Sequence, residues 1–188
     1  MEESETMSRE SDLRMQAFQQ AIERIAMLQS SEYAQAGGNM GMRSACVRGD
    51  IAAVEQLTKQ GTSINVELNP DGDTPLTKSI FSRQTDLAVW LIANGADVES
   101  ALHNGRTPLI TAAGCGDMRV VDALLAAGAC IDRQMNNGAT ALMYAVSKGF
   151  VDVARKLIQN GASITLRDND GWTVFDYAAM SGVDLATI

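Results

Sequence analysis

The chain has 188 residues, of which 46% are hydrophobic and 20% are charged, and its mean hydropathy of -0.05 is close to zero. This composition is typical of a folded protein in water, and no apolar run reaches the roughly 18 residues needed to cross a bilayer. A formal net charge of -8 argues against nucleic acid as a partner and favours a partner with a neutral or basic surface.

Residues 1–12 are polar and acidic, and we expect them to form a flexible tail. This segment lacks the basic and apolar regions of a secretory signal. The cysteines Cys46, Cys115 and Cys130 form no CxxC pair, which suits reduced thiols in a reducing compartment. We therefore expect a cytoplasmic protein, with the nucleus as the alternative compartment.

Residues 13–36 follow with the pattern of an amphipathic helix. Its apolar residues recur every three or four positions, at Met15, Phe18, Ile22, Ile25 and Leu28. We expect this helix to cap the units that follow, because the end of a repeat array needs a cover. Dimerisation through residues 13–29 is the alternative, although about two heptads are too few to establish a coiled coil. The segment has no basic face, which argues against membrane binding.

From residue 37 onward the sequence repeats with a period of 33 residues. Four Gly-x-Thr triplets begin at this spacing, at Gly72, Gly105, Gly138 and Gly171. The period gives a degenerate first unit at 37–70, full units at 71–103, 104–136 and 137–169, and a partial unit at 170–188. Such repetition predicts a solenoid, in which each unit buries its apolar face only against its neighbours. Function is then expected from an extended surface.

Each unit encodes two short helices and a hairpin, so the predicted fold class is all-α. A threonine that can cap a helix precedes the first, or inner, helix: Thr74, Thr107, Thr140 and Thr173. Glycines end the inner helix and the second, or outer, helix: Gly116, Gly149 and Gly182, then Gly95, Gly128 and Gly161. Arg83 stands where a glycine is expected, and if the backbone keeps a left-handed conformation there, the strain is on the order of 1 kcal/mol.

Two motifs recur in the full units. One reads Asp71-Gly-Asp-Thr-Pro-Leu, Asn104-Gly-Arg-Thr-Pro-Leu and Asn137-Gly-Ala-Thr-Ala-Leu, and the other reads Asn94-Gly-Ala-Asp, Ala127-Gly-Ala-Cys and Asn160-Gly-Ala-Ser. Over residues 37–188 this pattern resembles the ankyrin repeat family. The resemblance implies an α-solenoid of stacked hairpin, helix, helix units that recognise other proteins. The chain departs from it at the histidine of the family's TPLH motif, which is replaced by Thr77, Ile110, Met143 and Asp176.

Catalytic and metal-binding patterns are missing from the sequence. His103 is the only histidine, too few for a catalytic triad or a zinc site. The acidic hairpins lack the glutamate that ends a calcium loop. We expect no cofactor, no metal and no enzymatic activity.

In the family that the chain resembles, hairpin tips and inner helices line a concave binding groove. Carried over by register, four large residues are the expected anchors of a protein partner: Phe81, Arg106, Trp172 and Met180. Three polar residues are the expected rim: Asp73, His103 and Lys148. Tyr144 and Tyr177 lie one helical position away and could join this set. Trp90 falls on an outer helix and could mark a second, convex contact.

The sequence thus predicts a non-catalytic adaptor or scaffold that binds a protein, with no nucleic acid or membrane as a partner. The alternative is a recognition or regulatory segment of a longer enzyme or channel, whose catalytic part lies beyond residue 188.

Overall fold

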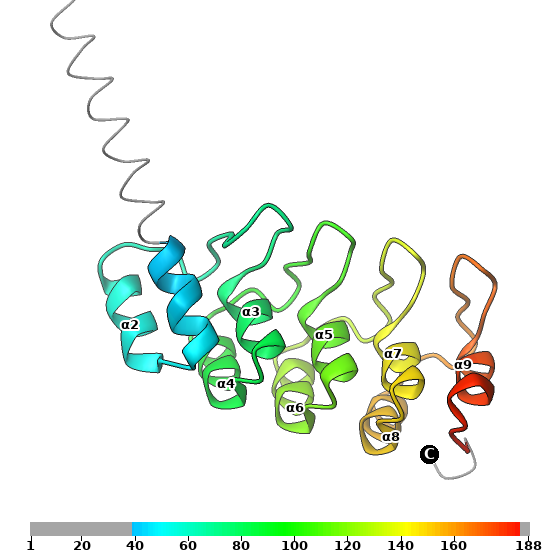
Figure 1. The fold of residues 1–188 in the computed structure, drawn as a ribbon. Helices are drawn as coiled ribbons and strands as arrows, with labels where there is room; N and C mark the ends of the chain where they lie inside the picture. The colour runs from blue at the N-terminus through cyan, green and yellow to red at the C-terminus, as the bar shows by residue number, and fades with distance from the viewer. Residues whose placement is uncertain (1–38, 185–188) are drawn as a thin grey trace, which may run out of the picture. The chain divides into compact units, whose positions relative to one another are not determined.

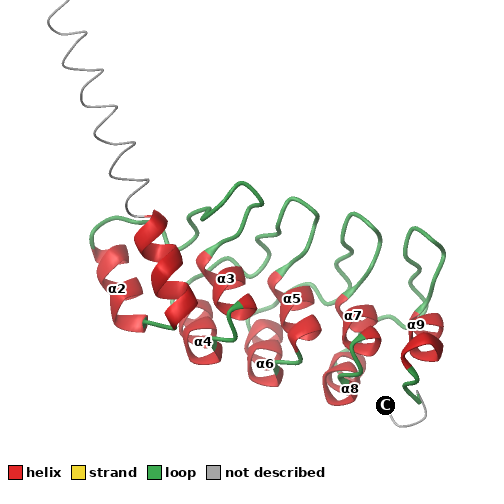
Figure 2. Cartoon of the chain, viewed as in Figure 1, coloured by secondary structure: helices red, strands yellow, loops and turns green. Residues whose placement is uncertain are grey.

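The computed structural model describes residues 39–184, so the expected tail at 1–12 and both roles predicted for residues 13–36 lie outside the described part. A helix covers residues 39–48, and further helices follow: α2 (Ile51–Lys59), α3 (Pro75–Phe81), α4 (Thr85–Ala93), α5 (Pro108–Cys115), α6 (Met118–Ala126), α7 (Ala141–Ser147), α8 (Val151–Gln159) and α9 (Val174–Ser181). Within residues 39–184 all regular secondary structure is helical (Figure 2). The predicted all-α fold is confirmed.

The helices stack in pairs, and the loops between pairs project to one side (Figure 1). The inner helices α3, α5, α7 and α9 pack against one another in sequence order, and each of α3, α5 and α7 also packs against the outer helix that follows it. The outer helices α4, α6 and α8 form a second layer. This is the predicted solenoid, in which contacts run between neighbouring units.

Threonines begin the inner helices, as their sequence positions predict. The side chains of Thr74, Thr107 and Thr140 accept a hydrogen bond from the backbone N–H three residues later. Thr173 is the N-cap of α9, and its backbone N–H donates to Asp176 Oδ2 over 2.7 Å in a capping box. Each cap satisfies a backbone group that a helix terminus would otherwise leave unpaired.

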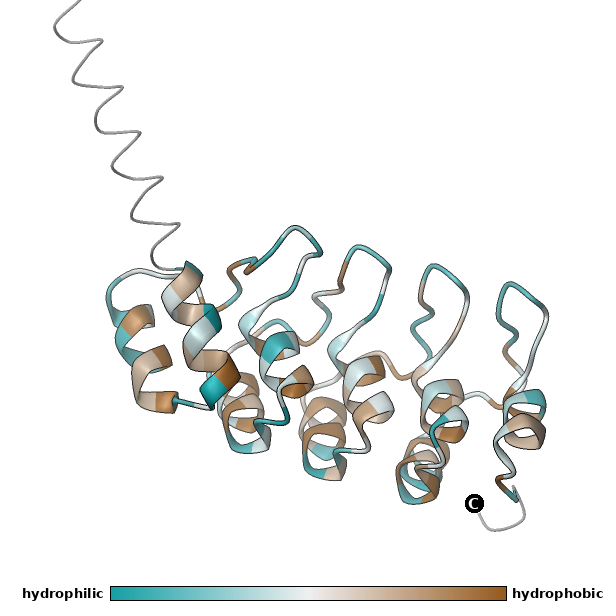
Figure 3. Cartoon of the chain, in the orientation of Figure 1, coloured by the Kyte–Doolittle hydropathy of each residue, from teal (hydrophilic) through white to brown (hydrophobic). Residues whose placement is uncertain are grey.

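The core lies between the two layers. Leu76, Leu109 and Leu142 occupy one register of α3, α5 and α7, and all three are fully buried. Apolar colour accordingly gathers on the helices, while the projecting loops are largely polar (Figure 3). Phe175 has the same register in α9 but is 52% exposed. Within the described residues no further unit follows α9 to cover it.

Single backbone hydrogen bonds join each hairpin to the next. The N–H groups of His103, Asn136 and Asn169 donate to Asp71, Asn104 and Asn137, over 2.9, 3.0 and 2.9 Å respectively. Glycine at each tip has φ between 81° and 83°: Gly72, Gly105, Gly138 and Gly171. At Gly72, Gly105 and Gly138 the missing side chain also allows the next hairpin to approach closely. The hairpins therefore form a continuous row beside the inner helices (Figure 1).

Arg83 has φ of 60°, so the backbone keeps the left-handed conformation of the glycine position. Its guanidinium donates to the Cys115 carbonyl oxygen over 2.5 Å, at the end of the next inner helix. This contact between units offsets part of the strain, since a left-handed residue with a side chain costs roughly 1–2 kcal/mol.

Candidate functional site

The candidate site is the surface formed by the hairpins and the inner helices around Phe81, Arg106, Tyr144, Trp172 and Met180, which we call the inner face. Phe81 is 38% exposed at the end of α3, Trp172 is 39% exposed on the last hairpin, and Met180 is 70% exposed on α9. Aromatic residues and methionine are the types enriched in protein interfaces. Their exposure leaves all three free to contact a partner, and their role in binding stays a prediction.

Arg106 connects three units of the array. Its guanidinium carbon lies 5.1 Å from the centroid of the Phe81 ring, in the preceding unit, and 4.9 Å from that of Tyr144, in the following unit. A cation over an aromatic face is attracted by the ring quadrupole, by about 0.5–2 kcal/mol depending on its exposure. The structure thus brings two of the predicted anchors together, and Tyr144 completes the group. We call these three residues the Arg106 stack.

Gly114 in α5 makes room for the Arg106 stack. A Cβ atom at this position would lie 3.1 Å from Arg106 Nη2 and 3.2 Å from Tyr144 Cδ1, closer than an ordinary van der Waals contact. The neighbouring units have Phe81 and Ser147 at the same register. Because Gly114 has no side chain, the Arg106 guanidinium can lie directly against α5.

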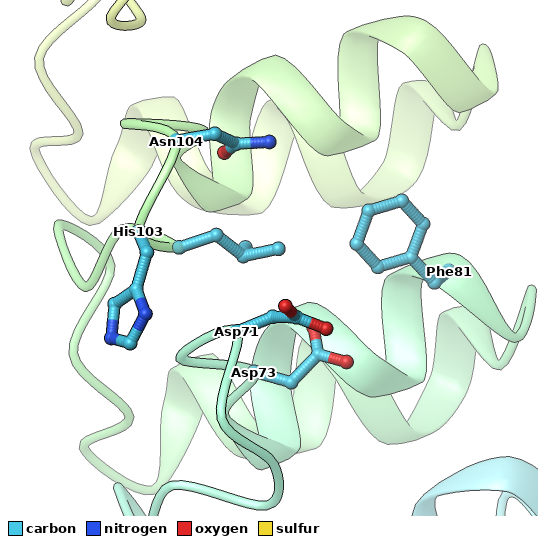
Figure 4. Close-up of a pocket in the computed structure, with 6 residues that line it drawn as sticks. Asp71, Asp73, Phe81, His103 and Asn104 are labelled. Atoms are coloured by element: carbon cyan, nitrogen blue, oxygen red, sulfur yellow. The ribbon is translucent and has the colours of Figure 1, made fainter.

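A hollow of about 510 Å³ opens beside Phe81, between α3 and the two hairpins next to it. It is lined by Asp71, Asp73, Phe81, Leu102, His103 and Asn104 (Figure 4). Both aspartates turn their carboxylates into this space in Figure 4. His103, a predicted rim residue, is exposed and lies at its edge.

The prediction that Asp73 is a rim residue is wrong, because the residue is only 6% exposed. Its Oδ2 accepts a hydrogen bond from the Asn69 side chain over 3.0 Å and lies 3.8 Å from Lys78 Nζ. The Thr77 hydroxyl donates to its other oxygen over 3.4 Å. Asp73 therefore fastens the hairpin to α3. Lys148, the remaining rim residue, is exposed at the end of α7.

Trp172 belongs to a second group on the inner face. Its ring meets Tyr177 edge to face, with centroids 5.8 Å apart and planes at 64°. Asp168 holds both residues, because its two oxygens accept from the Trp172 backbone N–H over 2.8 Å and from the Tyr177 hydroxyl over 2.7 Å. Asp168 is not among the residues predicted for the site, since nothing in the local sequence marks its bond to Tyr177.

The pKa of Asp168 is lowered and the pKa of Tyr177 is raised. Burial raises the pKa of Asp168, but the hydrogen bonds from Tyr177, Trp172 and Asp170 outweigh burial and leave that pKa below its ordinary value. Burial and the neighbouring Asp168 together raise the pKa of Tyr177 to about 12. The carboxylate and the neutral phenol are thus the stable forms over a wide pH range.

Replacing Tyr177 with phenylalanine is expected to lower the free energy of unfolding by about 1–2 kcal/mol at neutral pH, because Asp168 loses a donor. The lowered pKa of Asp168 means that this contribution is present above about pH 4 and is lost as the pH falls through the folded pKa. Because the pKa of Tyr177 is raised, the contribution of this hydrogen bond to the free energy of unfolding is also lost between about pH 10 and about pH 12. Urea unfolding of both proteins across pH measures the difference, and a difference that does not shrink in acid would contradict the assignment.

The described residues offer no group of three or more His, Cys, Asp or Glu side chains that could hold a metal ion. None of the helices in residues 39–184 has the length and apolar character needed to cross a membrane. Cys46 is buried, and burial raises the pKa of its thiol to about 12, which keeps it protonated and unreactive.

Comparison with known proteins agrees with the fold. The model of ankyrin repeats, three copies, matches residues 42–135, 87–168 and 132–188. The chain is similar to the 2-5A-dependent ribonuclease of Homo sapiens, with 32% identity over 71 residues, which are 38% of this chain and 10% of that protein. The same enzyme of Mus musculus is 34% identical over 68 residues, which are 36% of this chain and 9% of that protein. The chain thus spans about a tenth of the length of these curated relatives. With the family model matched from residue 42 to residue 188, this chain belongs to the ankyrin repeat family.

Proposed function

We propose that this chain is a non-catalytic adaptor or scaffold that holds a protein segment on its inner face. Ankyrin repeats generally serve as protein-binding modules, and their stacked units offer an extended surface. The observation that carries the proposal is the exposure of Phe81, Trp172 and Met180 on this surface. Aromatic residues and methionine are enriched in protein interfaces, where they supply most of the binding energy.

The proposal includes a cytoplasmic location, with the nucleus as the alternative, and needs no cofactor, metal, nucleic acid or membrane. The net charge of -8 favours a partner with a neutral or basic surface overall.

A display selection on the full chain would test this function. Peptides selected from a library of protein fragments are titrated against the native chain and against Phe81→Ala, Trp172→Ala and Met180→Ala. We expect at least one of these variants to lose about tenfold or more in affinity, the effect of truncating a strong interface anchor. The matched control is Arg119→Ala, which removes an exposed side chain from outer helix α6 and should leave affinity unchanged.

The opposite pattern would overturn the proposal. Affinity that survives all three inner-face variants but falls on Arg119→Ala or Trp90→Ala would place the partner on the outer helices. Circular dichroism and thermal melting of each variant separate loss of binding from loss of folding.

The alternative function is recognition or regulation within a longer enzyme or channel. It draws on the named relatives, which are ribonucleases of which the matched segment is about a tenth. Sequencing the transcript beyond the codon for Ile188 tests this reading. A further open reading frame that encodes an enzyme or channel would support it, and a stop codon directly after Ile188 would exclude it.

A further inference from the structure

Arg106 takes part in none of the ion pairs found among residues 39–184. The ion pairs of residues 39–184 involve other cations, among them Lys78 with Asp73 and Arg119 with Asp86. Arg106 Nε is buried and has no hydrogen-bond partner. Because Nε is shielded from solvent, an incoming acceptor would bind the Nη groups of the guanidinium instead.

The Arg106 stack holds this guanidinium in a fixed orientation. The Phe81 and Tyr144 rings lie near it at 5.1 and 4.9 Å, and Gly114 keeps the helix surface flat beneath it. A planar guanidinium whose position is set in advance loses little entropy when it binds a second planar group through paired hydrogen bonds. Carboxylates and phosphates are the acceptors that match this geometry.

The surrounding charges favour a carboxylate over a phosphate. Asp71 is exposed and lines the hollow that Phe81 also lines, so a nearby negative charge opposes an incoming dianion more than a single carboxylate. Lys148, on the next inner helix, is exposed and forms no ion pair among those of the described residues. It supplies a second, weaker attraction for acidic residues.

We propose that Arg106 receives the side-chain carboxylate of an Asp or Glu in the partner segment, while an apolar neighbour of that residue packs on Phe81. This inference rests on the proposed function, since it names the chemistry of the partner at the same inner face. It refines the expectation from net charge: the partner is neutral or basic overall but carries an acidic anchor residue.

The test is a double-mutant cycle on peptides selected by display against the full chain. Each acidic residue of a selected peptide is changed to its amide, Glu→Gln or Asp→Asn, and both peptides are titrated against the native chain and Arg106→Gln. We expect one acidic residue whose replacement costs about tenfold or more with the native chain and less than about twofold with Arg106→Gln, the coupling of a close charge pair. The matched control is Lys148→Gln, which removes an exposed, unstacked charge and should weaken binding by less than about threefold.

Arg106→Lys serves as a second variant in case Arg106→Gln fails to fold. It keeps the charge, and its weaker binding with an unchanged melting curve supports the requirement for a planar guanidinium. Peptides that depend on Phe81 or Trp172 but show no coupling between an acidic residue and Arg106 overturn this inference and leave the proposed function standing. Selection of peptides that bind only when phosphorylated also overturns it. Peptides indifferent to every inner-face variant overturn both.

Discussion

Replacing Leu109 with alanine is expected to lower the free energy of unfolding by about 2–5 kcal/mol, the usual cost of truncating a fully buried leucine. Leu109 is 1% exposed in α5, the inner helix that packs against α3, α6 and α7. The cavity would open where neighbouring units meet, and each unit depends on its neighbours to bury its apolar face. Equilibrium unfolding in urea, followed by circular dichroism, measures the loss.

Phe175→Ala is the matched control, because Phe175 has the same register in α9 but is exposed. We expect it to cost less than about 1 kcal/mol, as for most surface substitutions. A change in the slope of the unfolding curve with Leu109→Ala would indicate that the array no longer unfolds in one step. Equal losses for the two variants would contradict a core carried by contacts between units.

Features set by local sequence could be predicted well. The threonine caps place the starts of α3, α5, α7 and α9, because a cap acts within one helical turn. The repeated glycines fix where the chain turns, and even the departure at Arg83 keeps the backbone of its register. The all-α fold follows from these signals and the period of 33 residues.

Exposure on the inner face could not be predicted from register alone. Asp73, Arg106, Ala139 and Trp172 share one position of the repeat, yet Asp73 and Ala139 are buried while Trp172 is exposed. The carboxylate of Asp73 has local donors in its own unit, whereas the Trp172 ring packs edge to face against Tyr177. The residues of the Arg106 stack come from three different units, so no pattern within one unit could predict that they meet.

Gly138→Ala is expected to lower the free energy of unfolding by about 3 kcal/mol. Its φ of 83° costs a residue with a side chain roughly 1–2 kcal/mol. The new Cβ would also lie 2.7 Å from the backbone nitrogen of Asn169 and 2.7 Å from Asp168 Cα, so the last hairpin must move. Gly171→Ala is the matched control, since its φ is 82° but a Cβ there meets nothing within 4 Å. It should cost only the backbone strain.

The difference between these two glycine variants isolates the contact between hairpins. Moving the last hairpin weakens the hydrogen bond from the Asn169 N–H to the Asn137 carbonyl oxygen, now 2.9 Å long. The Asn169 amide should therefore exchange its hydrogen faster in Gly138→Ala than in Gly171→Ala. Because Asp168 lies in the displaced backbone and holds Trp172 and Tyr177, the same variant should also change the fluorescence of Trp172. Equal exchange in both variants would mean that the hairpins fold independently, and the row beside the inner helices would then be no rigid part of the binding surface.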